Sequence, residues 1–532
     1  MAQARSNDTL TDQLIHLLGA DRVAVDDETI TLMSQDVYKH GEPVAVVVRP
    51  ESTEQLSQVV AAAAAAGQAV IARGGGMSYT SGYLAVQPGS VLVDMSGMNK
   101  VLEVNEQDMY VTVQCGCTWM DLHDALKGTG LRTPYWGTLS GITATVGGGL
   151  SQNSIFWGSG QFGTCVDSVI GMEVVMADGE VLATGSGAQP NGSPFFRHYG
   201  PDLTGLFSGD NGALGLKATA TFRLIPELEE RRFLSFAFEN YDNLLAAMSE
   251  VARQGLAMEC FAFDPCLTGM RMQRESLAKD VKSLAGVMKA SGSVGGAIKS
   301  GLKVAMAGRR FMEDANYSVH IMVEERVAEA ADAAAAAIQK ICEGSNGEAL
   351  DDSIPRILRA NPFTPLNNVV GPNGERWAPI HAMLPHSKVA QVTRQIYELE
   401  QREAETLERH QIQVGFLFAT VSTNCFCLEP VFFWPDAMKE LHDLTVEAPV
   451  RKRLKGFDED LTARAEVQRL RKEMVDIFAA AGAAHLQVGK TYPLHQIKPR
   501  SWQALNEIKQ ALDPAHRINP GSLGLGADGT DA

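Results

Sequence analysis

The sequence predicts an α+β protein with two domains. At 532 residues the chain is longer than a single hydrophobic core usually supports. Up to Pro226, short β-branched runs alternate with helical stretches, and from Glu227 the pattern changes to longer helices and aromatic runs. We therefore expect a first domain over residues 1–226 and a second domain that begins at residue 227.

The expected elements of the first domain follow one another closely. An amphipathic segment over residues 10–18 should pack on the domain that follows it. Residues 53–66 contain an alanine run of high helix propensity and predict a helix. Residues 167–176 predict a strand that ends at the turn 177–180.

The second domain mixes strands with longer helices. Residues 258–264 and 317–323 predict strands, and residues 325–341 and 388–409 predict helices. Residues 271–310 carry nine basic and two acidic side chains in a chain whose net charge is −17. This segment could be a solvated helical face, or it could bind a membrane surface, bind an acidic partner or attract an anionic substrate.

A glycine-rich loop interrupts the first domain. A β-branched run from Val70 ends at three consecutive glycines, residues 74–76, which Ser78 and Thr80 follow. Because glycine lacks Cβ, its backbone can adopt positive φ and bring N–H groups close to a bulky anion. The loop therefore predicts a phosphate cradle, although it matches neither the Rossmann nor the nucleotide-triphosphatase motif. A tight turn is the alternative reading of the triplet alone.

A second glycine-rich segment spans residues 134–163 and includes the glycines 147–149. Two glycine- and hydroxyl-rich loops, each beside a strand-like run, suit one long ligand with a pyrophosphate in its middle. We therefore interpret the two loops as parts of one binding site.

Together these loops resemble the FAD-binding domain of the vanillyl-alcohol oxidase and p-cresol methylhydroxylase family, a group of FAD-linked oxidoreductases. Further segments are similar to the family in the same order, namely residues 45–56, 91–95, 111–122, 211–216 and 519–521. The resemblance implies an FAD-binding domain of two α/β subdomains, an α+β cap domain for the substrate over residues 227–484, and a return to the FAD-binding domain over residues 485–532. It also implies a homodimer.

The resemblance implies FAD as the cofactor. The residues that we expect to contact it lie in both glycine segments and towards the C-terminus: Arg73, Gly74, Gly75, Gly76, Met77, Ser78, Tyr79, Thr80, Gly82, Gly137, Thr138, Ile142, Thr143, Thr145, Val146, Gly148, Gly149, Asn153, Gly215, Leu216 and Asn519. Many relatives attach the flavin to a histidine behind the first glycine run, where this chain has Met77. We therefore expect non-covalent FAD. The alternative is a covalent link through His381 or Tyr492.

The expected catalytic residues lie near the C-terminus and in the cap. Residues 485–493 are loosely similar to the His-Trp-Gly-Lys stretch of the aldonolactone and alditol oxidases. By this resemblance Lys490 would stabilise negative charge on the reduced flavin, and His485 or Tyr492 would accept a proton. His381 is a further candidate. A core histidine and a surface lysine are the alternative readings.

The expected substrate pocket is aromatic. Arg376 and Trp377 stand in a stretch that resembles a cap strand of the family, and Trp434 lies in the aromatic run 425–436. Aromatic side chains at this density suit a flat substrate, and they suit a hydrophobic core equally well. Ser151 takes the place of an aspartate that vanillyl-alcohol oxidase has near the flavin, which puts a para-alkylphenol mechanism in doubt.

The sequence as a whole predicts an FAD-dependent oxidoreductase that removes hydride from a carbon bearing or conjugated to a hydroxyl group. The expected substrate is an aromatic or phenolic alcohol, and oxygen, an acceptor protein or a quinone would take the electrons. One alternative is a dehydrogenase for 2-hydroxy acids such as lactate or glycolate, which Arg376 or the basic segment would favour by binding a carboxylate. Another is the flavoprotein subunit of an electron-transfer complex.

Composition limits the possible partners. The acidic net charge argues against nucleic acid, whose phosphates require clustered positive charge. No apolar run is long enough for a signal peptide or a membrane span, so we expect a cytoplasmic protein without a transmembrane segment. Eight cysteines are too few for a disulfide scaffold, and neither they nor the histidines form a metal-binding motif, so we expect no metal.

Overall fold

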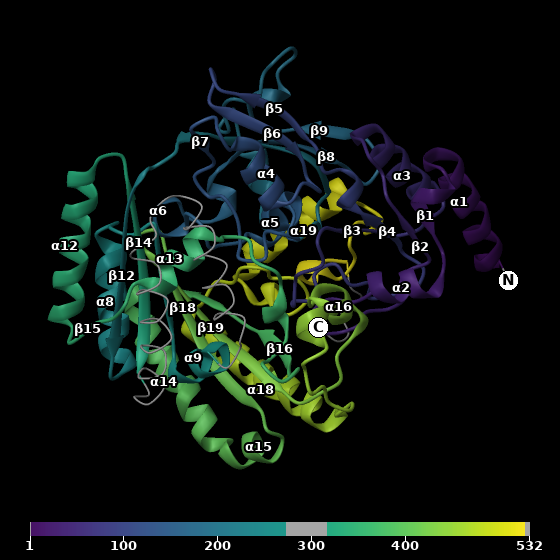
Figure 1. The fold of residues 1–532 in the computed structure, drawn as a ribbon. Helices are drawn as coiled ribbons and strands as arrows, with labels where there is room; N and C mark the ends of the chain where they lie inside the picture. The colour runs from purple at the N-terminus through teal and green to yellow at the C-terminus, as the bar shows by residue number, and fades with distance from the viewer. Residues whose placement is uncertain (1, 273–315, 527–532) are drawn as a thin grey trace. The chain divides into compact units, whose positions relative to one another are not determined.

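The computed structural model describes residues 2–272 and 316–526, which form two compact units (Figure 1). The first unit comprises Met1–Ile155, Thr164–Glu227 and His485–Ala532, and the second comprises Phe156–Gly163 and Leu228–Ala484. The short segment Phe156–Gly163 thus belongs to the second unit, which no feature of the sequence indicated. Most of the basic segment, residues 273–310, lies outside the described residues.

The first unit begins with a four-stranded sheet and the helices beside it. The strand order is β1 (Val23–Ala24), β2 (Val46–Val48), β4 (Val91–Asp94) and β3 (Val70–Arg73), and β2, β4 and β3 are parallel. The nearby helices are α1 (Ala2–Leu18), α2 (Asp27–Met33) and α3 (Thr53–Ala65). The parallel strands are almost wholly buried, which is why they consist of valine and isoleucine runs. Ser52 caps α3 by accepting a hydrogen bond from the Gln55 N–H, and this confirms the helix predicted from residue 53.

A five-stranded antiparallel sheet forms the other part of the first unit. Its strands are, in order, β5 (Val101–Asn105), β6 (Tyr110–Gln114), β10 (Leu216–Arg223), β8 (Val169–Val175) and β9 (Val181–Ala183). The remaining elements of this unit are α4 (Trp119–Leu126), β7 (Leu131–Arg132), α5 (Val146–Gln152), α7 (Leu203–Leu206), β11 (Ile225–Pro226) and α19 (Pro499–Leu512). The strand predicted over residues 167–176 is confirmed as β8.

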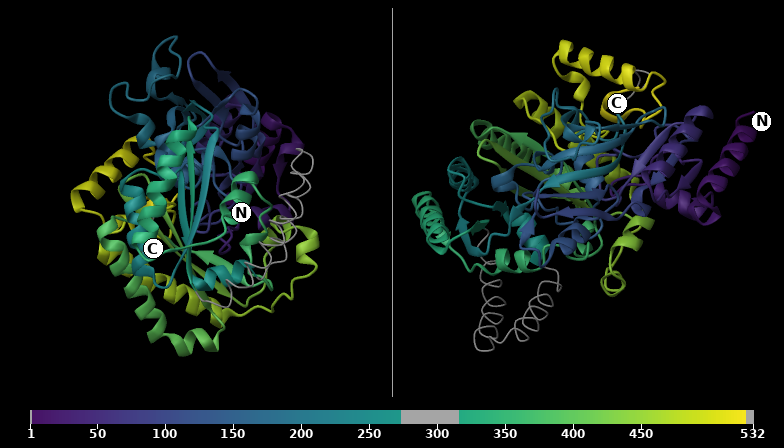
Figure 2. Two further views of the ribbon diagram at one scale, coloured as in Figure 1. Left: turned by 60° about the vertical axis from the view of Figure 1, so that its left-hand side comes forward. Right: turned by 90° about the horizontal axis from the view of Figure 1, so that it is seen from above.

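The second unit is built on an antiparallel sheet of eight strands (Figure 2). Its order is β15 (Glu348–Ala349), β12 (Glu230–Phe238), β14 (Tyr317–Glu325), β13 (Glu259–Phe263), β18 (Gln413–Val421), β19 (Cys425–Trp434) and β16 (Arg376–Pro379), and β17 (Ala382–Leu384) also pairs with β19. The strands β13 and β14 confirm the two predicted for this part of the chain.

Four helices form a layer on this sheet. They are α12 (Ala328–Gly344), α8 (Tyr241–Arg253), α14 (His386–Arg402) and α18 (Leu461–Ala481), which contact one another in this order and also contact the sheet. The helix predicted over residues 388–409 is divided into α14 and α15 (Ala404–Arg409) by a break at Glu403. The shorter helices of the unit are α6 (Ser159–Phe162), α9 (Pro265–Met272), α13 (Ser353–Ala360), α16 (Glu440–Thr445) and α17 (Ala448–Arg451).

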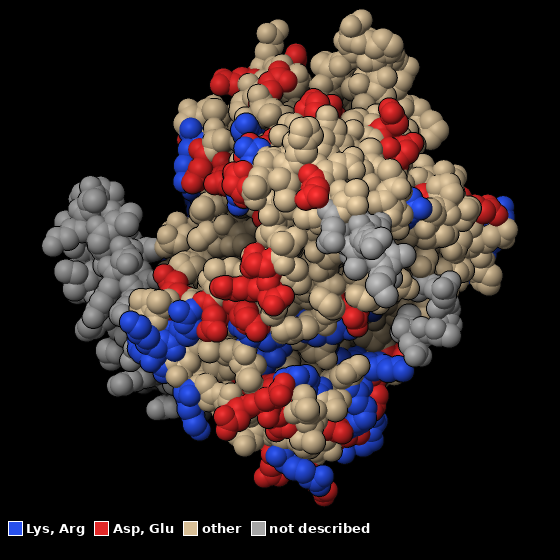
Figure 3. Space-filling view, turned by 90° about the vertical axis from the view of Figure 1, so that its right-hand side faces the viewer, with Lys and Arg blue, Asp and Glu red and all other residues tan. Residues whose placement is uncertain are grey.

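Charged side chains of both signs share the surface. On the face drawn in Figure 3, acidic and basic side chains are interspersed. Within the second unit, Arg469 forms ion pairs with Glu403, Glu466 and Glu473. Among residues 2–272 and 316–526, no helix is both long and apolar enough to cross a membrane.

Candidate functional site

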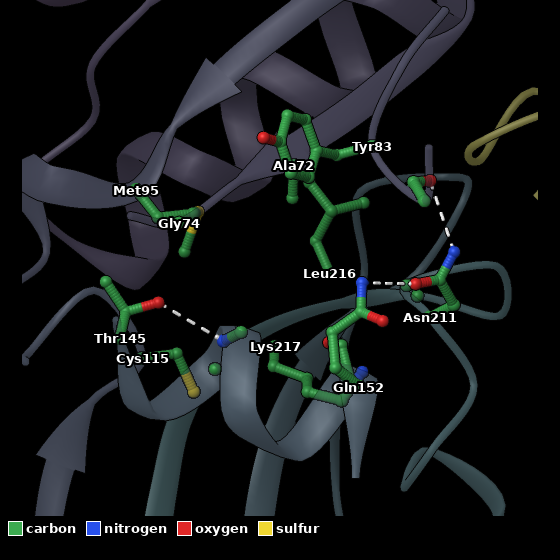
Figure 4. Close-up of a pocket in the computed structure, with 16 residues that line it drawn as sticks. Ala72, Gly74, Tyr83, Met95, Cys115, Thr145, Gln152, Asn211, Leu216 and Lys217 are labelled. Atoms are coloured by element: carbon green, nitrogen blue, oxygen red, sulfur yellow. Dashed lines mark hydrogen bonds between the residues drawn. The ribbon is translucent and has the colours of Figure 1, made fainter. Parts of the chain in front are cut away.

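A cavity lies within the first unit, where the two glycine segments meet (Figure 4). The space between its lining atoms is about 510 Å³, which includes open solvent at its mouth. The lining residues come from the first glycine loop, from strands on either side of it, from α5 and from the loop before β10: Ala72, Gly74, Gly82, Tyr83, Met95, Cys115, Thr145, Gly147, Gly148, Ser151, Gln152, Asn211, Gly212, Gly215, Leu216 and Lys217.

Five consecutive backbone N–H groups of the first glycine loop have no partner. In the described part of the chain, the N–H groups of residues 74–78 donate no hydrogen bond. Gly76 and Ser78 are buried and the other three residues are partly exposed, so the five N–H groups are available to an external acceptor. Gly76 has a φ of +73°, a left-handed conformation that glycine adopts without strain. A run of amides of this kind could hold the oxygens of a phosphate group.

Glycine is also required where the two loops touch. A Cβ on Gly74 would overlap the Thr145 side chain, and one on Gly75 would overlap the carbonyl of Thr143. Gly148 differs from these, because its Cβ would approach only Thr145 Oγ1, at 3.1 Å. The first two glycines therefore allow the loops to pack together, and Gly148 leaves space in the cavity that it lines.

The start of α5 is fixed by hydrogen bonds within the protein. Thr145 Oγ1 accepts a hydrogen bond of 3.2 Å from the Gly148 N–H, drawn in Figure 4, and the Gly147 N–H donates to the Cys115 carbonyl. The Cys115 thiol lines the cavity, and burial raises its pKa to about 12, so it is not a thiolate at neutral pH. The amides of α5 are thus used internally, unlike those of the first loop.

The loop before β10 is held by buried charges. Asp210 and Lys217 form an ion pair of 2.5 Å in which both side chains are buried, and Lys217 lines the cavity. The carboxylate of Asp210 also accepts hydrogen bonds from the N–H groups of Gly212 and Leu214. Lys509 of α19 donates to the Ala213 carbonyl at 2.6 Å. These contacts fix the loop that closes one side of the cavity.

Lys490 has surroundings that the sequence did not predict. Its Nζ donates hydrogen bonds to the carbonyls of Gly82 (3.0 Å) and Leu84 (2.9 Å) and to Asn519 Oδ1 (3.0 Å), and lies 3.5 Å from the Ser81 carbonyl. Burial lowers the pKa of Lys490 to about 7, with a further lowering by Lys39 and an opposing effect of Asp36. The ammonium thus joins the residue 81–84 loop to the C-terminal segment. This geometry does not fit the expectation that it presents its charge to a flavin.

The two other C-terminal candidates lie together. The rings of His485 and Tyr492 stack with 3.9 Å between their centroids and 10° between their planes. The Tyr492 side chain is buried, and His485 is partly exposed. The pair could take part in proton transfer, although neither residue lines the cavity of Figure 4.

The aromatic residues expected in a substrate pocket are mostly part of the core of the second unit. Trp434 is fully buried and donates through Nε1 to Asp436, and Phe432 and Phe433 are buried beside it. Arg376 is also buried, with its guanidinium 5.4 Å from the Trp434 ring centroid and Nη1 3.9 Å from Asp436 Oδ2. In this structure the Trp434 indole donates to Asp436 and Arg376 donates to the Ala437 carbonyl, and the place of the two residues in a substrate pocket stays a prediction.

His381 and Trp377 complete the residues expected in the second unit. His381 is fully buried between β16 and β17, whereas Trp377 is partly exposed on β16.

Some of the residues expected to contact the cofactor line the cavity, and others do not. Gly74, Gly82, Thr145, Gly148, Gly215 and Leu216 line the cavity, and so does Ser151, expected for the substrate. Tyr79 and Thr80 bond to the C-terminal segment instead, through Gln487 and Lys490. Asn519 donates to the carbonyls of Gly82 and Asn211. The expected residues of the second segment that do not line the cavity are in α5 and in the chain before and after it: Gly137, Thr138, Ile142, Thr143, Val146, Gly149 and Asn153.

Sequence reasoning missed several lining residues. Cys115 directly follows β6, and Lys217 is near the start of β10. The other residues of these strands belong to the core, so no local signal in the sequence marks the two lining residues. Gln152 ends α5 directly after Ser151, and the glycines before it could have pointed to it. In the part of the chain that the structure describes, no cluster of three or more His, Cys, Asp or Glu side chains is arranged to hold a metal ion.

Two domain models match the chain in the regions that build this site. The FAD binding domain matches residues 44–185, and the C-terminal domain of FAD linked oxidases matches residues 487–523. The glycolate oxidase subunit GlcD of Bacillus subtilis (strain 168) is 28% identical over 241 residues, which are 45% of this chain and 50% of that protein. The chain thus spans about half the length of the curated relatives that it matches.

Solved structures are similar over the whole chain. The 4-ethylphenol oxidase from Gulosibacter chungangensis, in a complex with isoeugenol, is similar with a TM-score of 0.71 and 18% sequence identity. The similarity covers 99% of this chain and 98% of the oxidase chain. The p-cresol methylhydroxylase with substrate bound has a TM-score of 0.71 at 17% identity with the same coverage. These similarities show the two-domain fold.

The chain carries an FAD binding domain and a C-terminal domain of FAD linked oxidases, and its cofactor is FAD. Its fold is similar to that of the 4-ethylphenol oxidase and the p-cresol methylhydroxylase. The unpaired amides of residues 74–78 and the space beside Gly148 fit a dinucleotide with a diphosphate at its centre.

Proposed function

We propose that this chain oxidises an alcohol-bearing or phenol-conjugated carbon, with an aromatic or phenolic alcohol as its substrate. The bound flavin would supply the hydride chemistry. In this proposal the N–H groups of residues 74–78 hold the diphosphate, and the cavity walls hold adjoining parts of the cofactor. The single observation that supports this placement best is the run of five unpaired amides.

The substrate class is supported by the extent of the similarities. Relatives found by sequence match 39–47% of the chain, whereas the fold of the two phenol-oxidising enzymes extends over 99% of it and so includes the second unit. The second unit is the expected cap domain for the substrate, so we take its similarity to the two phenol-oxidising enzymes as support for a phenolic or aromatic substrate; the fold of alkyldihydroxyacetonephosphate synthase also covers 96% of the chain. The stacked pair His485 and Tyr492 is the proposed proton acceptor, because Lys490 is enclosed by carbonyls.

Oxidation of a 2-hydroxy acid is the second candidate. The observation that favours it is the similarity to the glycolate oxidase subunit, whose name states the oxidation of a 2-hydroxy acid. Arg376, which the sequence offered as a cation for a substrate carboxylate, is buried and donates to the Ala437 carbonyl.

The test is anaerobic bleaching of the yellow flavin absorbance. Purified holoprotein is mixed with aromatic alcohols, para-alkylphenols and 2-hydroxy acids in turn, and air is then admitted. Bleaching by aromatic alcohols supports the proposal, and a rapid return of colour identifies oxygen as the acceptor. Bleaching by hydroxy acids alone would replace the proposed substrate class with the second candidate, and slow recovery in air would indicate a protein or quinone acceptor.

A further inference from the structure

One buried hydrogen-bond acceptor in the cavity has no partner. Gln152, the last residue of α5, lines the cavity, and its Oε1 is shielded from solvent. Among the described residues no group donates a hydrogen bond to this oxygen. A buried amide oxygen without a donor costs free energy, so its retention in a binding cavity indicates a donor on the ligand.

The orientation of the Gln152 amide follows from its neighbours. Asn211 Nδ2 lies 3.2 Å from the Gly82 carbonyl, which can only accept, so this atom of Asn211 must be the nitrogen. Asn211 Oδ1 therefore faces Gln152, and the Gln152 atom 2.6 Å from it must be Nε2 (Figure 4). These hydrogen bonds identify the unpaired atom of Gln152 as Oε1, which can only accept a hydrogen bond.

The surroundings of Gln152 indicate which part of the cofactor supplies the donor. Ala72, Tyr83, Met95 and Leu216 give the same cavity apolar walls. Walls of this kind suit a flat ring better than a chain of hydroxyl groups. The backbone of Gln152 is also held, because its carbonyl accepts a hydrogen bond of 2.7 Å from the Gln487 N–H.

We propose that Gln152 Oε1 accepts a hydrogen bond from an N–H group in or attached to one of the cofactor's rings, and so positions that ring in the cavity. This inference rests on the proposed placement of FAD in the cavity. Two groups of FAD have the required chemistry, the N3–H of the isoalloxazine ring and the exocyclic amino group of adenine. Either group would complete the chain of amides that begins at Gly82.

The experiment measures cofactor affinity and needs no substrate. Full-length protein is stripped of flavin and titrated with FAD, with FAD methylated at N3, and with FAD whose adenine amino group is replaced by oxygen; flavin fluorescence reports binding. The same titrations are made with Gln152→Leu. The control is Gln503→Leu, because Gln503 is exposed on α19 and bonds only Glu507.

The expected result is a coupling between Gln152 and one analogue. Gln152→Leu should raise the Kd for FAD about tenfold. In the wild type, the analogue that lacks the donor should bind about tenfold more weakly than FAD, and in Gln152→Leu it should bind as FAD does. The analogue that shows this loss identifies the isoalloxazine or the adenine ring.

Two results would overturn the inference. Equal losses for both analogues in the wild type and in Gln152→Leu would show that Oε1 accepts no ring N–H, as would an unchanged Kd for FAD in the variant. Failure of the wild type to bind FAD would contradict the placement of the cofactor itself, so the two proposals fail in different ways.

Discussion

At the scale of single residues, a side chain added at Gly75 and one added at Gly148 should have different effects. Gly75 lies against the backbone of Thr143, whereas Gly148 borders the space of the cavity. A side chain at Gly75 therefore disturbs the protein itself, and one at Gly148 disturbs what enters the cavity.

Gly148→Ala should leave the folded protein intact and raise the Kd for FAD about tenfold or more. Its Cβ would require only a small shift of Thr145 Oγ1, and alanine favours helix over glycine by about 1 kcal/mol. Gly75→Ala should lower both the melting temperature and FAD occupancy, because the Thr143 backbone would have to move. Flavin titration and thermal unfolding measure the two effects. Wild-type FAD affinity in Gly148→Ala would show that the ligand does not approach this glycine.

Lys490→Met should destabilise the protein without slowing its chemistry. The variant removes donors from the Gly82 and Leu84 carbonyls, and bonds from a charged donor contribute about 1.5–3 kcal/mol each before the cost of burying the charge. We expect a net loss of about 2–4 kcal/mol in the free energy of unfolding. In the folded fraction, the rate of anaerobic flavin reduction should stay within about twofold of the wild type. A loss of rate at full flavin occupancy would restore Lys490 as a catalytic residue.

At the scale of elements, Asp436 connects the end of β19 to α18. Its carboxylate accepts two hydrogen bonds of 2.9 Å from Arg464 and one of 3.1 Å from Trp434 Nε1. Burial acts to raise the pKa of Asp436, but the hydrogen bonds from Arg464, the Asp460 N–H and Trp434 outweigh it, and the pKa is lowered overall. This carboxylate is therefore charged and fully paired within the second unit.

Asp436→Ala should cost about 2–4 kcal/mol, because the buried Trp434 indole loses its acceptor and the partly exposed Arg464 loses its buried partner. Glu459→Gln is the matched control, since Glu459 also pairs with Arg464 but is exposed, and its loss should cost less than about 0.5 kcal/mol. Urea unfolding followed by circular dichroism measures both. Similar small effects of the two variants would contradict the structural role of Asp436.

Two carboxyl groups lie close together in the second unit, Asp264 between β13 and α9 and Glu400 on α14. Asp264 accepts hydrogen bonds from the N–H groups of Leu267 and Phe416, and burial raises its pKa to about 7. Burial, followed by the charge of Asp264, raises the pKa of Glu400 to about 8. The folded state thus holds protons that the unfolded state has released above about pH 4.5.

The stability of the second unit should therefore fall as the pH rises from about 5 to about 9. Glu400→Gln removes one titrating group while keeping its shape, so the variant should be more stable than the wild type at high pH and show a smaller fall. Glu398→Gln, on an exposed position of the same helix, is the control. Melting temperatures across this range provide the measurement. A fall of unchanged size in Glu400→Gln would show that Glu400 does not carry the buried proton.

At the scale of the whole molecule, the attachment of the flavin can be tested directly. Met77, whose side chain cannot bond a flavin, stands in the first loop, and the N–H of the same residue is among the five unpaired amides. We expect acid precipitation of the holoprotein to release all of the yellow colour into the supernatant. Colour that stays with the precipitate, followed by mapping of a flavin peptide to His381 or Tyr492, would establish a covalent link.

The sequence predicted most of the element types, because these depend on local chemistry: β-branched runs that form strands and an alanine run that forms α3. FAD and the residues expected around it came from the resemblance to a known family, and seven of the residues expected for the cofactor or the substrate line the cavity, among them Gly74, Thr145 and Ser151.

Only the tertiary structure decided the surroundings of the polar groups. The carbonyls of Gly82 and Leu84 around Lys490 and the hydrogen bond from the Trp434 indole to Asp436 come from parts of the chain or contacts that the local sequence does not mark. Gln152 was not predicted, although the glycines before it could have pointed to it. The chemistry of a polar side chain depends on which acceptors and donors reach it from distant parts of the chain, and no local pattern records those contacts.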